Sequence, residues 1–514
     1  MKHLILTGIL SYKANMEIPI GSITIVNSYE MKQFYLILSL FVLTACSRAL
    51  PEAEVVQQQP EIIPDYRGVI IPCNIAPLNF KLTKPEKSIA VFASPVSEFR
   101  IESYKGDFEI PQKKWEKISL EAKGKEIECT IYQYKNNAWL KYSPFSISVS
   151  KDSIDSHLVY RKIAPGYRMW SEMGIYQRNL RTFEEKEFLS NRLTNNNCMN
   201  CHSFCMQNPD KMLFHQRSTH AGTYIIQNGE IEKLNTKTDR LISALVYPSW
   251  HPSGDFVAFS VNDTKQDFHS SDPNRIEVFD NTSDVVIYDV KKREIITDSL
   301  LLSPNNMETF PTFSPDGKRL FFCSAPVLPM PESFREVKYN LLSLTFDSQR
   351  RSFGSQIDTL YQARQTGRSA KFPRVSPDGR YLLYTVSDYG NFSIWHKDAD
   401  LQMLDLASGN VDLLSGVNSD NVESYHSWSS NSRWFVFSSR RDDGLYTRLY
   451  ICHVDEQGRT GKPFLLPQES VDYYDNLLFS FNVPELIKGR IKVDTHKLIE
   501  ISKYGKPGSL IFSE

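Results

Sequence analysis

The chain lacks the signals that mark several large classes of protein. Its 59 Lys and Arg residues almost balance its 60 Asp and Glu residues, for a net charge of −1, and no basic tract stands out. This charge pattern argues against a nucleic-acid partner, because phosphate binding requires a concentrated positive face. The sequence contains no G-x-S-x-G, H-E-x-x-H, P-loop or dinucleotide motif, so hydrolase and nucleotide-dependent activities are not indicated.

The chain also lacks a hydrophobic run long enough to cross a bilayer, since residues 34–45 fall short of the roughly 20 that a spanning helix needs. From Met31 the order is a lysine, this apolar run and a Leu-Thr-Ala-Cys ending at Cys46, which is the layout of a secretory signal. The ending resembles a bacterial lipoprotein box, which implies that Cys46 is lipidated. We therefore expect residues 1–45 to be an upstream extension and signal peptide, with translation starting at Met1 or Met31. The mature protein would be lipid-anchored to a membrane of the cell envelope, facing the periplasm or the surface.

The mature sequence divides into a tether, two β-rich parts and a junction between them. Residues 46–65 are rich in Pro, Gln and Glu without a hydrophobic period, which is typical of a flexible tether. Residues 66–160 alternate apolar and polar residues between turns, which predicts a small β-sandwich-like module. Cys73 and Cys129 in this module could form a disulfide, since an exported location permits one. Residues 161–210 have a mixed, partly helical character and form the junction.

An internal repeat covers most of the remaining chain. Four stretches align without gaps: YPSWHPSGDFVAFSVND from Tyr247, FPTFSPDGKRLFFCSAP from Phe310, FPRVSPDGRYLLYTVSD from Phe372 and YHSWSSNSRWFVFSSRR from Tyr425. Their Ser-Pro-Asp-Gly segments have β-turn chemistry, and the apolar runs behind them suit buried strands. A second strand pair completes a four-stranded blade in each unit, and one degenerate unit at each end brings the expected number of blades to six. The repeats therefore predict an all-β protein with a six-bladed β-propeller over residues 211–514, and they resemble TolB-like and WD-type propeller repeats.

Three of the chain's 8 cysteines and one histidine lie close together in the segment NNNCMNCHSFC, residues 195–205. Cys198, Cys201 and His202 form C-x-x-C-H, the attachment pattern of c-type haem. In this pattern two thiols add to the vinyl groups of one haem, and the histidine is the proximal ligand of the iron. An exported location favours this interpretation, because c-type haem is attached outside the cytoplasm. The motif thus predicts covalent haem at Cys198 and Cys201.

Other interpretations of the segment stay open, because Cys205 is a third thiol that haem attachment does not require. The three cysteines and a histidine could bind zinc, or the thiols could hold an iron–sulfur cluster. Two of the cysteines could instead form a disulfide, and the segment could also carry no cofactor. The candidates for a second iron ligand are methionines and histidines on either side of the motif: Met169, Met173, Met206, Met212, His215 and His220.

The order of a lipoprotein leader, a β module, the C-M-N-C-H segment and Ser-Pro-Asp-Gly repeats resembles a group of exported bacterial proteins. These are TolB-like propeller lipoproteins, loosely described as related to cytochrome c biogenesis. The resemblance implies a membrane-anchored propeller that binds a protein or glycan partner, with haem adding electron transfer. The alternative is a cofactor-free binding or assembly scaffold whose cysteine cluster is structural or binds zinc. A haem-dependent oxidoreductase also stays open, because the sequence does not identify the sixth iron ligand.

Overall fold

The computed structural model describes residues 49–164 and 172–512 of the chain. The lipidation predicted at Cys46 and the candidate iron ligand Met169 lie outside these residues. Within the described residues, no helix has the length and the apolar character to cross a membrane.

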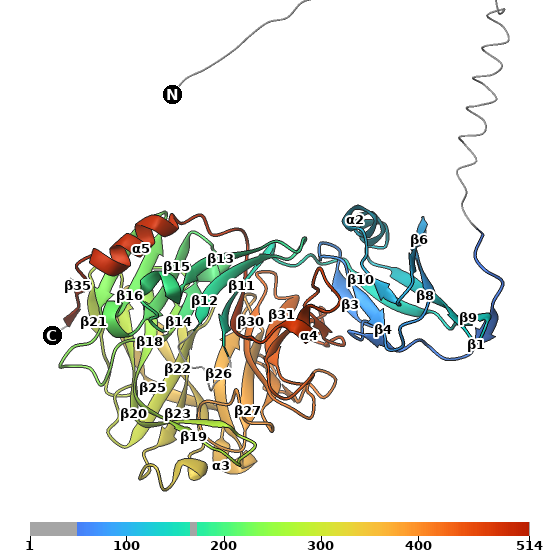
Figure 1. Cartoon of the computed structure of the whole chain (residues 1–514). Helices are drawn as coiled ribbons and strands as arrows, with labels where there is room; N and C mark the ends of the chain where they lie inside the picture. Colours follow the sequence, from blue (N-terminus) through green and yellow to red (C-terminus); the bar gives the residue numbers. More distant parts are fainter. Residues whose placement is uncertain (1–48, 165–171, 513–514) are drawn as a thin grey trace, which may run out of the picture. The chain divides into compact units, whose positions relative to one another are not determined.

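The second of the chain's two compact units, Ala53–Glu514, begins with a module of two sheets and a helix (Figure 1). The larger sheet has seven strands: β1 (Glu54–Val56), β3 (Ile70–Pro72), β5 (Ser88–Ala93), β6 (Glu98–Ser103), β8 (Glu126–Lys135), β9 (Ala138–Tyr142) and β10 (Phe145–Ser150). The smaller sheet has three: β2 (Ile62–Ile63), β4 (Phe80–Leu82) and β7 (Asp107–Phe108). Helix α2 (Gln112–Glu121) buries Trp115 and Ile118 in the core of this module.

This module starts earlier than the sequence predicted. Strand β1 pairs in parallel with β9, with Glu54 opposite Leu140, so part of the predicted tether 46–65 belongs to a sheet. The strand is largely exposed and has no apolar period, and its partner lies far along the chain. Local sequence patterns report periodic burial and not distant pairing, which is why they give no sign of this strand.

The disulfide predicted between Cys73 and Cys129 is wrong for this structure, in which both are free thiols. Strand β10 separates them, because Cys129 lies opposite Phe145 at one end and Cys73 follows Pro72, which lies opposite Ser150 at the other. Five residues of strand at about 3.3 Å each put the two cysteines roughly 16 Å apart. A disulfide requires Cα atoms within about 7 Å.

The rest of this unit forms six sheets in which four strands pair antiparallel in turn. The first contains β34 (Ser480–Ile487), β11 (His157–Ile163), β12 (Met173–Asn179) and β13 (Glu185–Ser190). The second contains β14 (Met199–Phe204), β15 (Lys211–Gln216), β16 (Gly222–Gln227) and β17 (Glu230–Asn235). The third contains β18 (Val246–Trp250), β19 (Phe256–Phe268), β20 (Ile276–Asp289) and β21 (Glu294–Ile296).

Three more sheets follow in chain order. The fourth contains β22 (Asn306–Phe313), β23 (Arg319–Pro326), β24 (Asn340–Asp347) and β25 (Ser352–Tyr361). The fifth contains β26 (Ser369–Val375), β27 (Tyr381–Ser387), β28 (Asp400–Asp405) and β29 (Val411–Asp412). The sixth contains β30 (Glu423–Trp428), β31 (Trp434–Ser439), β32 (Arg448–His453) and β33 (Phe464–Leu465).

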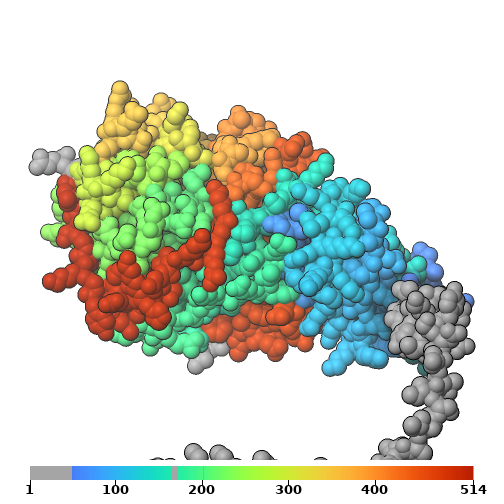
Figure 2. Space-filling view, turned by 90° about the horizontal axis from the view of Figure 1, so that it is seen from above, coloured from blue at the N-terminus to red at the C-terminus, as the bar shows by residue number. Residues whose placement is uncertain are grey.

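Short helices and a C-terminal segment complete the described part of the chain. The helices are η2 (Asn191–Thr194), η3 (Cys205–Gln207), η4 (Ser218–His220), η5 (Phe334–Glu336), α3 (Ala363–Thr366), α4 (Tyr473–Asn476) and α5 (Thr495–Tyr504). After α5, strands β35 (Gly508–Ser509) and β36 (Ile511–Phe512) pair in parallel with β17 and β21. Figure 2 shows this C-terminal segment, in red, lying across the surface of the earlier strands.

The first strands of the six sheets follow one another in space. Strand β14 contacts β18, the series continues through β22, β26, β30 and β34, and β34 contacts β14 again. Strand β34, near the end of the chain, pairs antiparallel with β11, so one sheet joins the beginning and the end of this part. The arrangement confirms an all-β, propeller-like fold.

The predicted junction, residues 161–210, consists largely of strands of these sheets. Strands β11 to β13 belong to the sheet of β34, and the C-x-x-C-H motif lies on β14, the first strand of the next sheet. The propeller-like part thus begins at His157, inside the predicted sandwich module. These strands carry no Ser-Pro-Asp-Gly turn, so the repeat pattern does not reveal them.

The Ser-Pro-Asp-Gly segments adopt the predicted β-turn. The hydroxyl of Ser314 donates to the Asp316 carboxylate at 2.6 Å, and the copy at residues 376–379 repeats this distance. The N–H of Gly317 donates to the carbonyl of Ser314, the first residue of the motif, at 2.9 Å, and the N–H of Gly379 donates to the carbonyl of Ser376 at 2.8 Å. Both glycines have positive φ, 74° and 76°, a conformation that side chains disfavour.

Candidate functional site

Each first strand carries a bulge close to its start. At the register shifts lie five residues with a positive φ between 43° and 53°: Tyr247, Phe310, Phe372, Tyr425 and Val483. A bulge leaves an extra residue without a cross-strand partner and turns its side chain in a new direction. In β14 the shift lies between Asn200 and Ser203, so Cys201 and His202 occupy the corresponding place.

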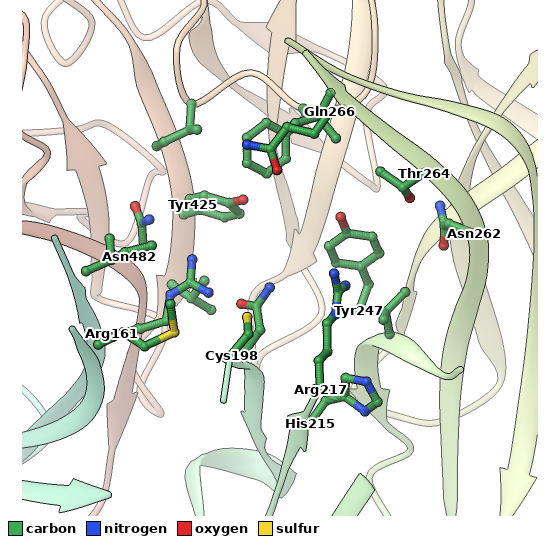
Figure 3. Close-up of a pocket in the computed structure, with 18 of the residues that line it drawn as sticks. Arg161, Cys198, His215, Arg217, Tyr247, Asn262, Thr264, Gln266, Tyr425 and Asn482 are labelled. Atoms are coloured by element: carbon green, nitrogen blue, oxygen red, sulfur yellow. The ribbon is translucent and has the colours of Figure 1, made fainter. Parts of the chain in front are cut away.

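These bulges surround a cavity of about 1130 Å³ (Figure 3). Four aromatic rings follow one another around it, with centroid distances of 4.6 Å from Tyr247 to Phe310, 4.3 Å from Phe310 to Phe372 and 4.8 Å from Phe372 to Tyr425. We call these four residues the aromatic belt. Val483 takes the next position in the series, and the bulge of β14 takes the last. The C-x-x-C-H motif therefore forms one side of the cavity wall.

Cys198 and His202 both line this cavity. Cys198 directly precedes β14 and is buried, and its carbonyl accepts the N–H of Arg217 at 2.9 Å. His202 is 2% exposed, and its Nε2 has no hydrogen-bond partner among the described residues. Burial, together with the nearby Arg161 guanidinium, lowers the pKa of His202 to about 3, so the imidazole is neutral at pH 7. The backbone of Cys201 belongs to β14, and its side chain lies outside the described part.

Two candidate second ligands also line the cavity. His215 lies in β15 opposite Asn200, and its Nδ1 is 3.2 Å from the Thr223 hydroxyl. Burial lowers the pKa of His215 to about 3, so this ring is neutral as well. Met173 lies at the start of β12, and its sulfur accepts the N–H of Met199 at 3.4 Å. Both side chains stand in the wall that carries the motif.

The other candidates in the described residues are not part of the cavity wall. Met206 and Met212 pack in two separate hydrophobic clusters between sheets. His220 lies in η4, where its Nε2 is 3.1 Å from the Asn195 side-chain amide. These three residues are accounted for by packing and local hydrogen bonding.

Cys205 lies at the far end of β14 from Cys198. Its thiol faces the carbonyl of His251 at 3.7 Å, and it packs beside Leu213 and Trp250. Burial raises the pKa of this thiol to about 11. Seven residues of largely extended chain separate the two cysteines by roughly 20 Å, which does not match a zinc or iron–sulfur site built from all three thiols. Among the described residues, no group of three or more His, Cys, Asp or Glu is placed to hold a metal ion.

The cavity wall is strongly basic, although the chain as a whole has a net charge of −1. Its basic residues are Arg161, Arg217, Lys237, Arg275, Arg374 and Arg440, against two acidic residues, Asp263 and Glu485. In the view of Figure 3, Arg161 and Arg217 lie on either side of Cys198. Sequence reasoning missed this cluster, because its members come from different sheets and form no tract.

A long hairpin borders the same cavity. Strands β19 and β20 extend beyond their sheet, and residues such as Thr264 and Gln266 on this extension line the cavity. Two buried carboxylates anchor the hairpin to the loop that follows β27. Asp280 accepts the Thr264 hydroxyl of the hairpin at 2.6 Å and the Asn391 side-chain amide of the loop at 2.5 Å, and Glu277 accepts the Tyr389 hydroxyl at 2.8 Å.

No protein-family model matches the chain, and no curated protein matches it either. Among solved structures, oligogalacturonate lyase from Vibrio parahaemolyticus is 10% identical with a TM-score of 0.31, over 56% of this chain and 85% of the lyase. Prolyl oligopeptidase B from Galerina marginata is 10% identical with a TM-score of 0.33, over 65% of this chain and 41% of the peptidase. Arabinanase from Bacillus subtilis is 10% identical with a TM-score of 0.24, over 43% of this chain and 77% of the arabinanase. Similarity at this level assigns no role to the residues of the cavity.

Proposed function

We propose that the protein is a lipid-anchored envelope protein whose cavity holds a covalent c-type haem. Its six sheets would be the blades of a closed six-bladed propeller, with the cavity on the axis. Cys198 and Cys201 would carry the thioether bonds, and His202 would be the proximal iron ligand. The bound haem would supply one-electron transfer.

The observation that carries this proposal is the place of His202 in the C-x-x-C-H motif and in the cavity wall. A buried imidazole normally has both ring nitrogens in hydrogen bonds, because an unsatisfied buried polar group costs free energy. Here the ring is neutral and faces the backbones of Val159 and Val483, while Nε2 makes no direct hydrogen bond among the described residues. A neutral imidazole with a free nitrogen is the form that binds a metal. The Cys198 thiol stands in the same wall.

The size and lining of the cavity support this proposal. Its volume of about 1130 Å³ is slightly larger than the roughly 300–1,000 Å³ that is usual for small-molecule and cofactor sites. The aromatic belt offers an apolar surface to the macrocycle, and the basic residues of the wall offer partners to its carboxylates. His215 and Met173 are the proposed choices for the sixth ligand, because both line the cavity.

The propeller would act as a binding platform for a protein or glycan partner in the envelope. The loops and the long hairpin that border the cavity are the surface from which such a partner would reach the haem. A cofactor-free scaffold, with the cysteines structural or binding zinc, is the competing function. The two functions differ in whether the protein contains covalently bound haem, which can be measured directly.

The test is production of the full chain together with cytochrome c maturation machinery. A Soret band that survives acid–acetone extraction is expected for the wild type, and its loss is expected for Cys198→Ala and Cys201→Ala. Cys205→Ala is the matched control, because it removes a thiol of the same segment that lies outside the cavity, and it should keep its haem. Colourless protein with one equivalent of zinc, or with a Cys198–Cys201 disulfide, would refute the haem proposal.

A further inference from the structure

The basic residues beside the C-x-x-C-H motif lack acidic partners within the protein. None of the ion pairs between described residues includes Arg161 or Arg217, whereas many other arginines of the chain are paired, for example Arg351 with Asp289 at 3.1 Å. Arg161 is buried, and a buried guanidinium without a counter-charge is costly because it loses hydration, whereas Arg217 is exposed. The excess charge is therefore available for an anionic ligand.

Of the two residues, Arg161 gives the stronger evidence for an anion-binding site. It lies in β11, is 8% exposed and lines the cavity. One Nη donates to the Met199 carbonyl at 3.3 Å, which fixes the side chain next to the haem motif. Its Nε is buried and has no hydrogen-bond partner among the described residues. The second Nη makes no hydrogen bond among the described residues, so the fixed guanidinium can offer this group to one oxygen of a carboxylate in the cavity.

Arg217 lies on the other side of the motif (Figure 3). It follows β15, and its own N–H is fixed to the Cys198 carbonyl at 2.9 Å, while its exposed side chain lines the cavity. Its charge contributes to the lowered pKa of His215, which places it near that ring. In this view two guanidinium groups thus lie on either side of Cys198, one from β11 and one from the residue after β15.

The two acidic residues of the wall do not neutralise this pair. Asp263 belongs to the long hairpin, where its carboxylate accepts the Asn281 amide at 2.8 Å. Glu485 accepts the N–H of Phe204 at 3.0 Å, and burial raises its pKa to about 7, so it is only partly charged at neutral pH.

We infer that Arg161 and Arg217 bind the carboxylates of a ligand that carries two such groups on a flat, largely apolar body. The aromatic belt argues for the flat body, and the two separate guanidinium groups argue for two anionic groups. The inference deepens the proposed function, because the tetrapyrrole of haem is one source of this chemistry. A soluble dicarboxylate shares the anionic part, and the experiment separates the two sources.

The experiment uses the full chain produced without haem maturation and three probes: protoporphyrin IX, its dimethyl ester and succinate. Binding of protoporphyrin IX is followed by its absorbance and fluorescence. We expect the dimethyl ester to bind roughly a hundredfold to ten-thousandfold more weakly, since it loses two charge-assisted hydrogen bonds and each contributes about one to two factors of ten. Succinate that displaces protoporphyrin at equal concentration would instead identify a soluble dicarboxylate as the source of the carboxylates.

Variants of Arg161 and Arg217 test whether these two residues cause the preference for protoporphyrin IX over its dimethyl ester. Arg161→Gln and Arg217→Gln should each weaken protoporphyrin binding by roughly tenfold and leave the ester unchanged, whereas Arg161→Lys should recover part of the loss. Arg178→Gln is the matched control, because Arg178 is buried in the neighbouring strand β12 and donates to the Pro467 carbonyl, away from the cavity wall. Thermal unfolding of each variant reports whether the fold is retained, and the Lys variant tests the charge if the Gln variant unfolds.

The two proposals fail in different ways. Equal affinity for protoporphyrin IX and its ester, or arginine variants that bind both probes like the wild type, would overturn the carboxylate site even if haem is attached. A chain that attaches no haem during maturation but prefers the free acid would instead overturn the haem proposal and leave the carboxylate site standing.

Discussion

Replacing Gly317 with alanine should destabilise the fold more than the same change at Gly379, although both glycines end a Ser-Pro-Asp-Gly turn. Their φ angles are 74° and 76°, so both variants lose roughly 1–2 kcal/mol to the left-handed conformation. Only at Gly317 does an added Cβ collide, because it would lie 2.2 Å from Nε2 of His251. At Gly379 nothing lies within 4 Å of it.

The His251 ring cannot move aside cheaply. Its centroid lies 5.0 Å from the ring of Phe313 and 5.7 Å from that of Phe256, and its Nε2 is 3.1 Å from the Gly317 carbonyl. Forcing a methyl group into such packing costs roughly 1–3 kcal/mol. We therefore expect a loss of about 2–5 kcal/mol in the free energy of unfolding for Gly317→Ala and about 1–2 kcal/mol for Gly379→Ala.

Urea unfolding of the full chain, followed by tryptophan fluorescence and far-ultraviolet circular dichroism, measures both losses. In a His251→Ala background the collision is gone, so Gly317→Ala should then cost no more than Gly379→Ala, and the double-mutant cycle gives the coupling. Equal losses for the two glycines in the wild-type background would refute the reasoning, because the backbone conformation would then account for the whole effect.

Three further predictions concern the closure of the sheets, a buried acid and the long hairpin. A chain that ends after Leu477 lacks β34, so β11 loses its antiparallel partner, and limited proteolysis should cleave β11 and β12 much faster than in the full chain. Burial raises the pKa of Glu308 to about 7, above its unfolded value of 4.5, so this residue favours folding below pH 4.5 and loses that contribution as the pH rises towards 7. The stability of Glu308→Gln relative to the wild type should therefore rise by of order 1–3 kcal/mol between pH 4.5 and pH 7 in urea unfolding, because glutamine cannot ionise, and a pH-independent difference would contradict this. Tyr389→Phe removes the hydroxyl that donates to Glu277 at 2.8 Å and should speed amide exchange in the β19–β20 extension, with unchanged exchange in β22 as the control.

The turns and the repeated strands could be predicted because their signals are local. Within the segment at residues 314–317, Pro, Asp and Gly each favour the turn for a reason that involves only neighbouring atoms, and the structure has the expected hydrogen bonds. Strands β1 and β11 could not be placed in the same way. Their sheets form through partners far along the chain, β9 and β34, and a short exposed strand such as β1 carries no periodic pattern.

The same distinction between local signals and distant partners applies to the candidate site. The spacing of Cys198, Cys201 and His202 is visible in the sequence, but the neighbours that make it a site are not. Arg161 and Arg217 reach the cavity from β11 and from the end of β15, so only the assembled sheets bring them to the motif. The role of Cys205, open from the sequence, follows from its place at the other end of β14 among core side chains.

A comparison of two histidines shows what the fold alone explains and what it does not. His202 and His426 occupy the same kind of bulge in β14 and β30, both are almost fully buried, and burial lowers the pKa of both to about 3. His426 has no neighbouring cysteines, so a buried neutral histidine at this place in the fold does not by itself indicate a haem site. The two rings differ in the nitrogen that lacks a partner. In His426 the outer nitrogen, Nε2, lies 3.0 Å from the Leu383 carbonyl and Nδ1 has no partner, whereas in His202 it is Nε2 that has none among the described residues. Each ring also faces two backbone groups, those of Val159 and Val483 at His202 and those of Leu383 and Phe372 at His426, so the cysteines beside His202 are the feature that sets its bulge apart.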